Sequence, residues 1–232
     1  GADAGAAYLF QRTGDTWSEI KIIYPSNIGA NDSFGLSISS SETDLVISGP
    51  TLNNAAGDVY LYSHTKTRNF YITQPGTYRA DLQICGIDYK TNEVEVTGSV
   101  TPTKSWKSNE DQILYASDAA TNHYFGSDTA ISGNYAIVGA FDEDVSGGTD
   151  SGAAYIFYKS GTTWSQQAKL KASDPSTSDK FGHRVDIEGD YAIVGAYNKN
   201  SSTGAVYIFY RSGTSWTQQA KLTASNAGAG DE

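Results

Sequence analysis

The chain has 232 residues, enough for one large all-β domain or two small ones, and its net charge is −10. The negative charge argues against nucleic acid as a partner, and the absence of a run of about 18 apolar residues argues against direct membrane insertion. One cysteine, Cys85, excludes an intrachain disulfide, while 16 Tyr, 8 Phe, 4 Trp and 24 Gly are typical of short strands joined by many turns.

Residues 1–33 correspond to half of a repeating block. An apolar run at 5–10 predicts one strand, and the turn at Gly14 followed by Trp17 predicts the next. We expect these to be the last two strands of a four-stranded unit, because the same two elements close each later block.

A degenerate block follows at 34–124 and begins with Phe-Gly. Residues 45–50 and 57–62 predict its two central strands. A strand-rich insertion at about 64–104 then replaces the short turn expected there.

The insertion contains Pro75-Gly-x-Tyr before an alternating strand, which is similar to the late strands of immunoglobulin-like domains. It is too short for a full sandwich. Three interpretations stay open: it packs on the rest of the chain, it pairs with a neighbouring subunit, or it is a hairpin without a partner.

Two complete blocks, 125–180 and 181–232, align end to end with one gap. The second predicts four strands, at 184–187, 191–196, 205–210 and 216–222. The second strand is apolar at consecutive positions, so we expect both of its faces to be buried. The fourth alternates and suits an outer edge.

The Phe-Gly starts, the two Ala-Ile-Val-Gly-Ala strings and the Gly-Thr-Thr-Trp and Gly-Thr-Ser-Trp turns resemble the FG-GAP repeat of the integrin α-subunit propeller. The resemblance implies an all-β fold, a β-propeller of four-stranded blades, with about three and a half blades in this chain. It also implies a role in adhesion or ligand recognition.

The acidic loop 142–150 is the candidate metal site. Asp142, Asp144 and Asp150 offer oxygen ligands at spaced positions, with glycines that allow a tight wrap, as Ca²⁺ requires. The loop resembles the calcium-binding blade loops of integrin-type propellers. A solvated acidic loop without metal is the alternative.

Other candidate residues lie in predicted loops. Tyr124 and Tyr197 depart from the repeat pattern and are candidate ligand contacts. The sequons at Asn31 and Asn200 predict glycosylation if the source has a eukaryotic secretory route. The four tryptophans recur at one place in each block, which favours a structural wedge between blades over ligand stacking: Trp17, Trp106, Trp164 and Trp216.

No nucleophile elbow, phosphate-binding loop or metal-binding histidine spacing is present. We therefore expect a non-enzymatic module, located outside the cell, on a cell surface or on a virion, that binds a protein or glycan ligand within a larger surface protein or assembly. A structural subunit of an appendage, coat or virion, in contact with neighbouring subunits, is the alternative. A calcium-dependent glycan-binding or polysaccharide-acting propeller is the weaker one.

Overall fold

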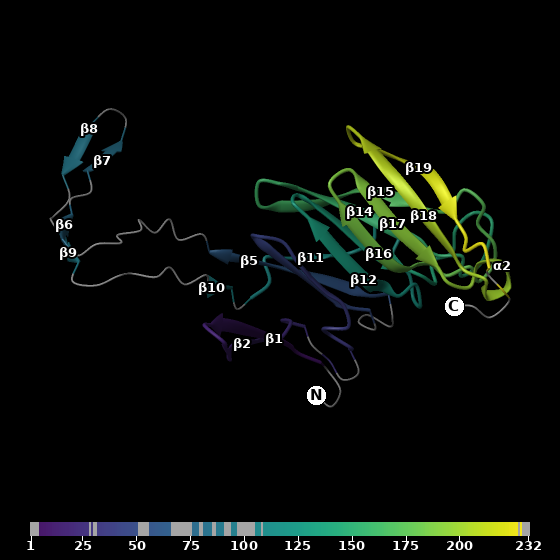
Figure 1. Ribbon diagram of the computed structural model, residues 1–232, viewed down its shortest axis with the longest axis horizontal. Coiled ribbons are helices and arrows are strands. Elements are labelled where there is room, and N and C mark those ends of the chain that lie inside the picture. Colours follow the sequence, from purple (N-terminus) through teal and green to yellow (C-terminus); the bar gives the residue numbers. More distant parts are fainter. Residues whose placement is uncertain are drawn as a thin grey trace. The chain divides into compact units, whose positions relative to one another are not determined.

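The computed structural model describes residues 5–27, 29, 32–50, 56–65, 76–78, 81–84, 87–90, 94–96, 105–107, 109–226 and 228. The described residues form antiparallel sheets joined by turns (Figure 1). The chain divides into two compact units, residues 1–63 with 107–232 and residues 64–106.

Two complete blades lie in the larger unit. One sheet has the strand order β12-β13-β14-β15 and the next has β16-β17-β18-β19. Tight turns at Gly133 and Gly189, both at positive φ, join the first strand of each sheet to the second. The strands are β12 (Phe125–Ser132), β13 (Tyr135–Ala140), β14 (Ala153–Ser160), β15 (Thr163–Leu170), β16 (Phe181–Glu188), β17 (Tyr191–Ala196), β18 (Ala205–Ser212) and β19 (Ser215–Leu222).

The degenerate block forms a third sheet of the same kind. Its strands run β3 (Ile38–Ser40), β4 (Asp44–Gly49), β5 (Asp58–Thr65) and β11 (Gln112–Leu114). The fourth strand has only three residues, and the insertion places it more than 40 residues after β5 in the sequence.

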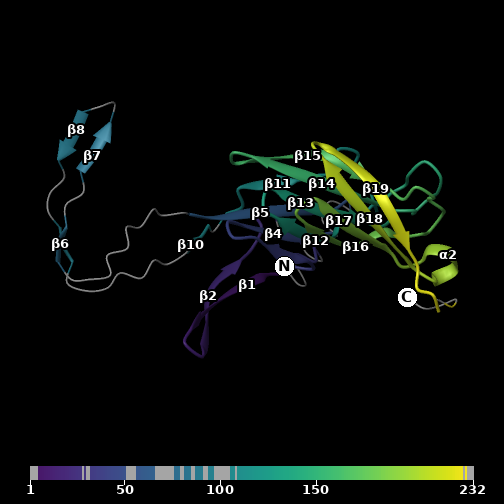
Figure 2. The same cartoon turned by 45° about the horizontal axis from the view of Figure 1, so that its top comes forward.

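The first block contributes a two-stranded sheet, β1 (Ala7–Thr13) paired with β2 (Thr16–Ile23). Figure 2 shows this hairpin projecting from the other sheets of the larger unit. Together these sheets confirm the predicted all-β class and the four-stranded blades.

The described residues of the smaller unit include two antiparallel strand pairs, one lying within the other in the sequence. β6 (Gly76–Tyr78) pairs with β9 (Val94–Val96), and β7 (Asp81–Ile84) pairs with β8 (Ile87–Lys90) between them. β10 (Ser105–Trp106) pairs with the end of β5. Cys85 and the predicted strand near 69–72 lie outside the described residues.

Neighbouring blades bury apolar side chains between them. Ile137 and Leu170 from one sheet pack with Phe181, Val185 and Ile187 from the next in a single cluster. A second cluster joins the degenerate sheet to β12–β15 in the same way. The blade core is therefore an inter-sheet core, with each sheet covering its neighbour.

Two predictions for the last blade differ from the structure. Tyr191 and Ile193 of β17 are exposed, because no further sheet in the described part of the chain covers that face. The loop after β17 contains a one-turn helix, α2 (Lys199–Ser202). No helix among the described residues is long and apolar enough to cross a membrane.

Candidate functional site

The residue before each Phe-Gly has an unusual backbone. Ser33, Tyr124 and Lys180 all have positive φ, at 52°, 51° and 59°. L-residues other than Asn and Asp rarely adopt this conformation, so it marks a turn imposed by the surrounding structure. At Tyr124 the backbone thus follows the repeat, and only the side chain departs from it.

An aromatic row starts at Tyr124 and crosses two blades. The ring of Tyr124 stacks on Phe141 with centroids 5.2 Å apart and planes 18° apart. Phe141 lies 5.4 Å from His183, and His183 lies 4.6 Å from Tyr197. All four side chains are half-buried. We call Tyr124, Phe141, His183 and Tyr197 the aromatic row.

Two hollows flank the row. One, of about 400 Å³, is lined by Tyr124, Phe141, Asp128 and residues of the degenerate blade. The other, of about 290 Å³, lies beside Tyr197 on the last blade. His183 and Arg184 line both hollows, so the row separates two adjoining depressions.

Charged groups complete the wall of the larger hollow. Asp128 accepts hydrogen bonds from the Ser37 hydroxyl and the Val185 amide, each 2.9 Å long. Ser37, Asp128 and Arg184 all stand third after their Phe, so each of three blades places the same position at this wall. Arg184 is exposed and donates to the His183 carbonyl at 3.0 Å, which leaves donors for a ligand.

A model of the FG-GAP repeat matches residues 17–62, 108–157 and 164–209, more than half of the chain. The chain belongs to the FG-GAP repeat family. FG-GAP repeats are common in extracellular ligand-binding propellers, are mostly non-catalytic and often bind Ca²⁺. A search of curated proteins finds no match.

The FG-GAP matches are offset from the sheets. The match at 164–209 begins in β15 and ends in β18, and the match at 17–62 begins in β2 and ends in β5. Each sequence repeat thus includes the loop that leads from one blade into the next.

The same two hydrogen bonds hold the inter-blade loop at two successive blades. The Tyr155 hydroxyl and the Lys169 ammonium both donate to Asp118, at 2.8 and 2.7 Å. Burial acts to raise the pKa of the Asp118 carboxyl, but these two hydrogen bonds outweigh it and lower the pKa. In the next blade Tyr207 and Lys221 donate to Asp174 at the same distances, and the pKa of Asp174 is likewise lowered.

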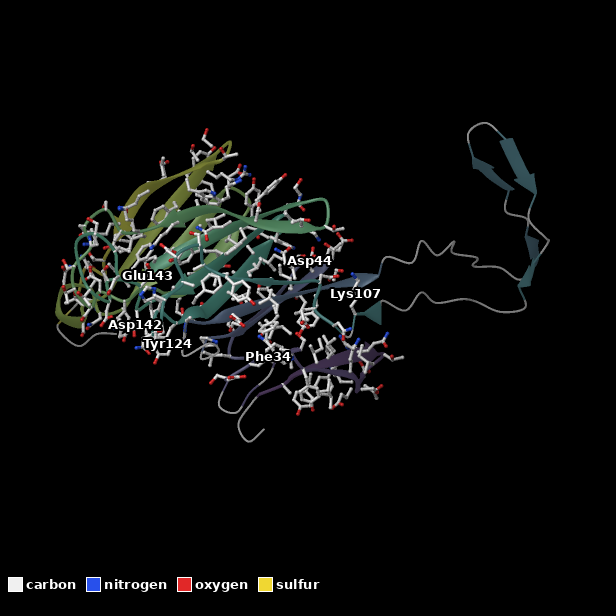
Figure 3. The ribbon with its side chains drawn as sticks, turned by 180° about the vertical axis from the view of Figure 1, so that it is seen from behind. Phe34, Asp44, Lys107, Tyr124, Asp142 and Glu143 are labelled. Carbon is white, nitrogen blue, oxygen red and sulfur yellow. The ribbon has the colours of Figure 1, made fainter. Side chains whose placement is uncertain are left out.

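The acidic loop of this FG-GAP chain lies at the end of the blades that carries Tyr124 (Figure 3). Asp142 contacts the Lys180 ammonium, and Asp150 lies 3.5 Å from it. Asp144 accepts the Asp150 amide at 2.8 Å. Burial acts to lower the pKa of Lys180, but Asp142 outweighs it and the pKa rises, so the cation is held firmly.

The Lys180 ammonium lies against Asp142 and Asp150, two of the three carboxylates predicted to bind calcium. The described residues contain no cluster of three His, Cys, Asp or Glu that is able to hold a metal. Calcium binding by Asp142, Asp144 and Asp150 stays a prediction.

Two further contacts between ionisable side chains lie at this end of the blades. His123 contacts Glu143, which also accepts from Lys169 at 2.6 Å. Asp179, in the position equivalent to His123, pairs with Lys199 at 2.7 Å. The acid of the contact is Glu143, after the second strand, in one blade and Asp179, before the first strand, in the next, so the acidic and basic positions are exchanged between the two blades.

The remaining candidate residues, the two sequon asparagines and the four tryptophans, do not belong to the aromatic row. Asn200 is exposed within α2, and Asn31 lies outside the described residues. Trp164 is buried between two blades, and the Trp216 indole donates to Gln167 of the preceding blade at 3.2 Å. Trp17 is exposed, and the side chain of Trp106 lies outside the described part.

Sequence reasoning identified Tyr124 and Tyr197 but not the residues between them. Phe141 aligns with Tyr197, one residue after each Val-Gly-Ala, and this equivalence was available in the repeat alignment. His183 and Arg184 carry no such signal, because only the packing of two blades brings them to the row.

Proposed function

We propose that this FG-GAP chain is a non-enzymatic extracellular binding module that engages a protein or glycan ligand at the aromatic row. The observation that carries the proposal is the continuous path of rings from Tyr124 to Tyr197 between two adjoining hollows. Half-buried rings with an adjacent guanidinium are the usual anchors of a binding surface, since they offer apolar area together with hydrogen-bond donors.

The surrounding contacts support binding rather than catalysis. The carboxylates next to the row are occupied: Asp128 accepts hydrogen bonds from three donors, and Asp142 contacts Lys180. A general acid or base needs a carboxyl group that is able to exchange a proton with substrate. The proposed location, outside the cell or on a cell or virion surface, rests on the family.

The experiment is a binding screen of the whole chain against glycan and protein arrays, followed by calorimetry on any hit. Tyr124→Ala and Arg184→Ala should each weaken binding at least about tenfold, the range of an interface anchor. Tyr24→Ala is the matched control, because Tyr24 is 54% exposed but does not line either hollow. A ligand that binds Tyr124→Ala, Arg184→Ala and wild type equally well would count against the proposal.

A second candidate function, a structural subunit of a surface assembly, is favoured by a different observation. Exposed apolar side chains gather on two elements of the larger unit: Tyr8, Phe10, Trp17, Ile20 and Ile22 on the first hairpin, and Tyr191, Ile193, Val206 and Leu222 on the last blade. Contiguous apolar faces of this kind mark association sites. A native mass that stays monomeric at high concentration would contradict self-assembly.

A further inference from the structure

Arg184 is an arginine without a carboxylate partner. Of the three arginines that the structure describes, Arg12 and Arg211 each contact an aspartate. Arg184 forms no ion pair within the described part of the chain, and its guanidinium donates only to the His183 carbonyl. It is exposed and lines the larger hollow. Because a guanidinium offers five donors in a planar fork that matches a carboxylate, this wall of the hollow suits an anionic group.

Tyr124 and Phe141 give the same hollow an apolar wall. The two rings are nearly parallel, with centroids 5.2 Å apart and planes 18° apart, and both are half-buried. The face of an aromatic ring carries negative charge and attracts positively polarised C–H groups. An anion is therefore favoured at Arg184, and the uncharged body of the same ligand is favoured on the rings.

The strand edges at this hollow are already occupied. β12 and β16 are the first strands of their sheets, so each has one edge without a neighbouring strand in the described part of the chain. Side chains of the preceding blade cover these edges: the Thr129 amide donates to the Ser37 hydroxyl at 3.0 Å, and the Val185 amide donates to Asp128 at 2.9 Å. Extended peptides commonly bind by pairing with a free strand edge. The hollow therefore favours a compact ligand over an extended peptide.

The remaining polar groups suit hydroxyl groups on the ligand. The Ser33 side chain lines the hollow, is half-buried and makes no hydrogen bond within the described part of the chain. Asp128 accepts from the Ser37 hydroxyl and from the Thr129 and Val185 amides, at 2.9, 3.0 and 2.9 Å. These donors offset its negative charge, so Asp128 does not exclude an anion at Arg184, and its oxygens retain capacity to accept from a hydroxyl.

We propose that the larger hollow binds a hexuronic acid residue of a glycan. Arg184 binds the carboxylate, Tyr124 and Phe141 pack against the sugar ring, and Ser33 and Asp128 receive its hydroxyl groups. The volume of about 400 Å³ lies within the range of small-molecule sites. This inference rests on the binding function proposed above and deepens it by naming the class of ligand.

The test is isothermal titration of the whole chain with oligosaccharides of galacturonic, mannuronic and glucuronic acid. Each is paired with its carboxyl-reduced form, in which a CH₂OH group replaces the carboxylate and the ring and its other hydroxyls are kept. We expect one of these uronates to bind at least about tenfold more tightly than its reduced form, because reduction removes the charge-assisted hydrogen bonds to Arg184. EDTA in every titration excludes binding through a bridging calcium ion.

Three variants assign that preference to the hollow. Arg184→Gln should reduce it to less than about twofold, with an unchanged Tm. Lys171→Gln is the matched control, because it removes the same charge from an exposed side chain that lines neither hollow, and it should keep the wild-type preference. Tyr124→Ala should weaken uronate binding at least about tenfold but keep the preference over the reduced form, since both ligands share the contact with the ring.

The outcomes separate this inference from the proposed function. Equal affinity for a uronate and its reduced form, with both weakened in Tyr124→Ala, would overturn the inference and leave the binding function standing. The same holds if no uronate binds while another array ligand requires Tyr124 and Arg184. Equal losses in Arg184→Gln and Lys171→Gln would also overturn the inference, because the attraction would then be to the overall charge. Uronate binding that neither Tyr124→Ala nor Arg184→Gln weakens would contradict both proposals.

Discussion

Gly139 faces the carbonyl oxygen of Gly182 across the boundary between two blades. A methyl group on Gly139 would lie 1.9 Å from that oxygen, closer than any carbon can approach. Gly195 holds the same position in the last blade, where the nearest atoms to such a methyl group are those of Arg184, at 3.7 Å. One glycine is therefore required by a neighbouring backbone, and its equivalent is not.

The first prediction uses this pair. Gly139→Ala should lower the free energy of unfolding by about 1–3 kcal/mol, because the two sheets must move apart to admit the methyl group. Gly195→Ala should change it by less than about 0.5 kcal/mol. Urea unfolding followed by tryptophan fluorescence measures both. Equal changes would show that the contact between Gly139 and Gly182 is not a constraint.

The second prediction concerns the buried pair of Lys199 and Asp179, whose side chains are 3% and 5% exposed. Lys199→Ala should destabilise the chain by about 3–5 kcal/mol, since it leaves a buried carboxylate without its cation. Lys221→Ala is the control: its ammonium pairs with Asp174 at the surface and should contribute less than about 1 kcal/mol. The double variant Lys199→Met, Asp179→Leu should be more stable than Lys199→Ala, and the opposite order would contradict the argument.

The third prediction is a loss of stability in acid. The pKa values of Asp118 and Asp174 are lower in the folded chain than the ordinary value of about 3.9 in the unfolded chain, because Tyr and Lys donors outweigh the effect of burial. A depressed folded pKa contributes stability that is present above the unfolded pKa and is lost as pH falls through the folded pKa. The urea midpoint should therefore decrease as pH falls below about 4.

The double variant Asp118→Asn, Asp174→Asn tests which groups carry this loss. Its urea midpoint should be lower than that of wild type at pH 7 and should depend less on pH between about 4 and 2. If the urea midpoint of the variant depends on pH as steeply as that of wild type, other carboxyl groups cause the loss of stability in acid.

The fourth prediction concerns calcium. Lys180→Gln should bind Ca²⁺ more tightly than wild type in isothermal titration, because it removes the ammonium group that Asp142 and Asp150 share. Asp144→Asn in the Lys180→Gln background should weaken that binding. Wild-type binding as tight as that of Lys180→Gln would show that the loop rearranges around the ion.

Much of the blade was predictable from local signals. The strand 191–196 was predicted with the bounds that β17 has, because a turn glycine precedes it and its residues are apolar at consecutive positions. The aromatic row was only partly predictable. Tyr124 stacks on Phe141, 17 positions later in the sequence, and His183 joins from the next blade. Periodicity within one strand carries no information about such a contact.

The residues of Tyr-Ala-Ile-Val-Gly-Ala are enough to predict a strand, and this hexapeptide forms one twice, as β13 and β17. They do not predict how far each copy is buried. Ile137 is fully buried and Ile193 is 44% exposed, although the two hexapeptides are identical. Strand formation depends on the residues of the segment, whereas burial depends on whether another sheet lies against it, and only the tertiary structure decides that.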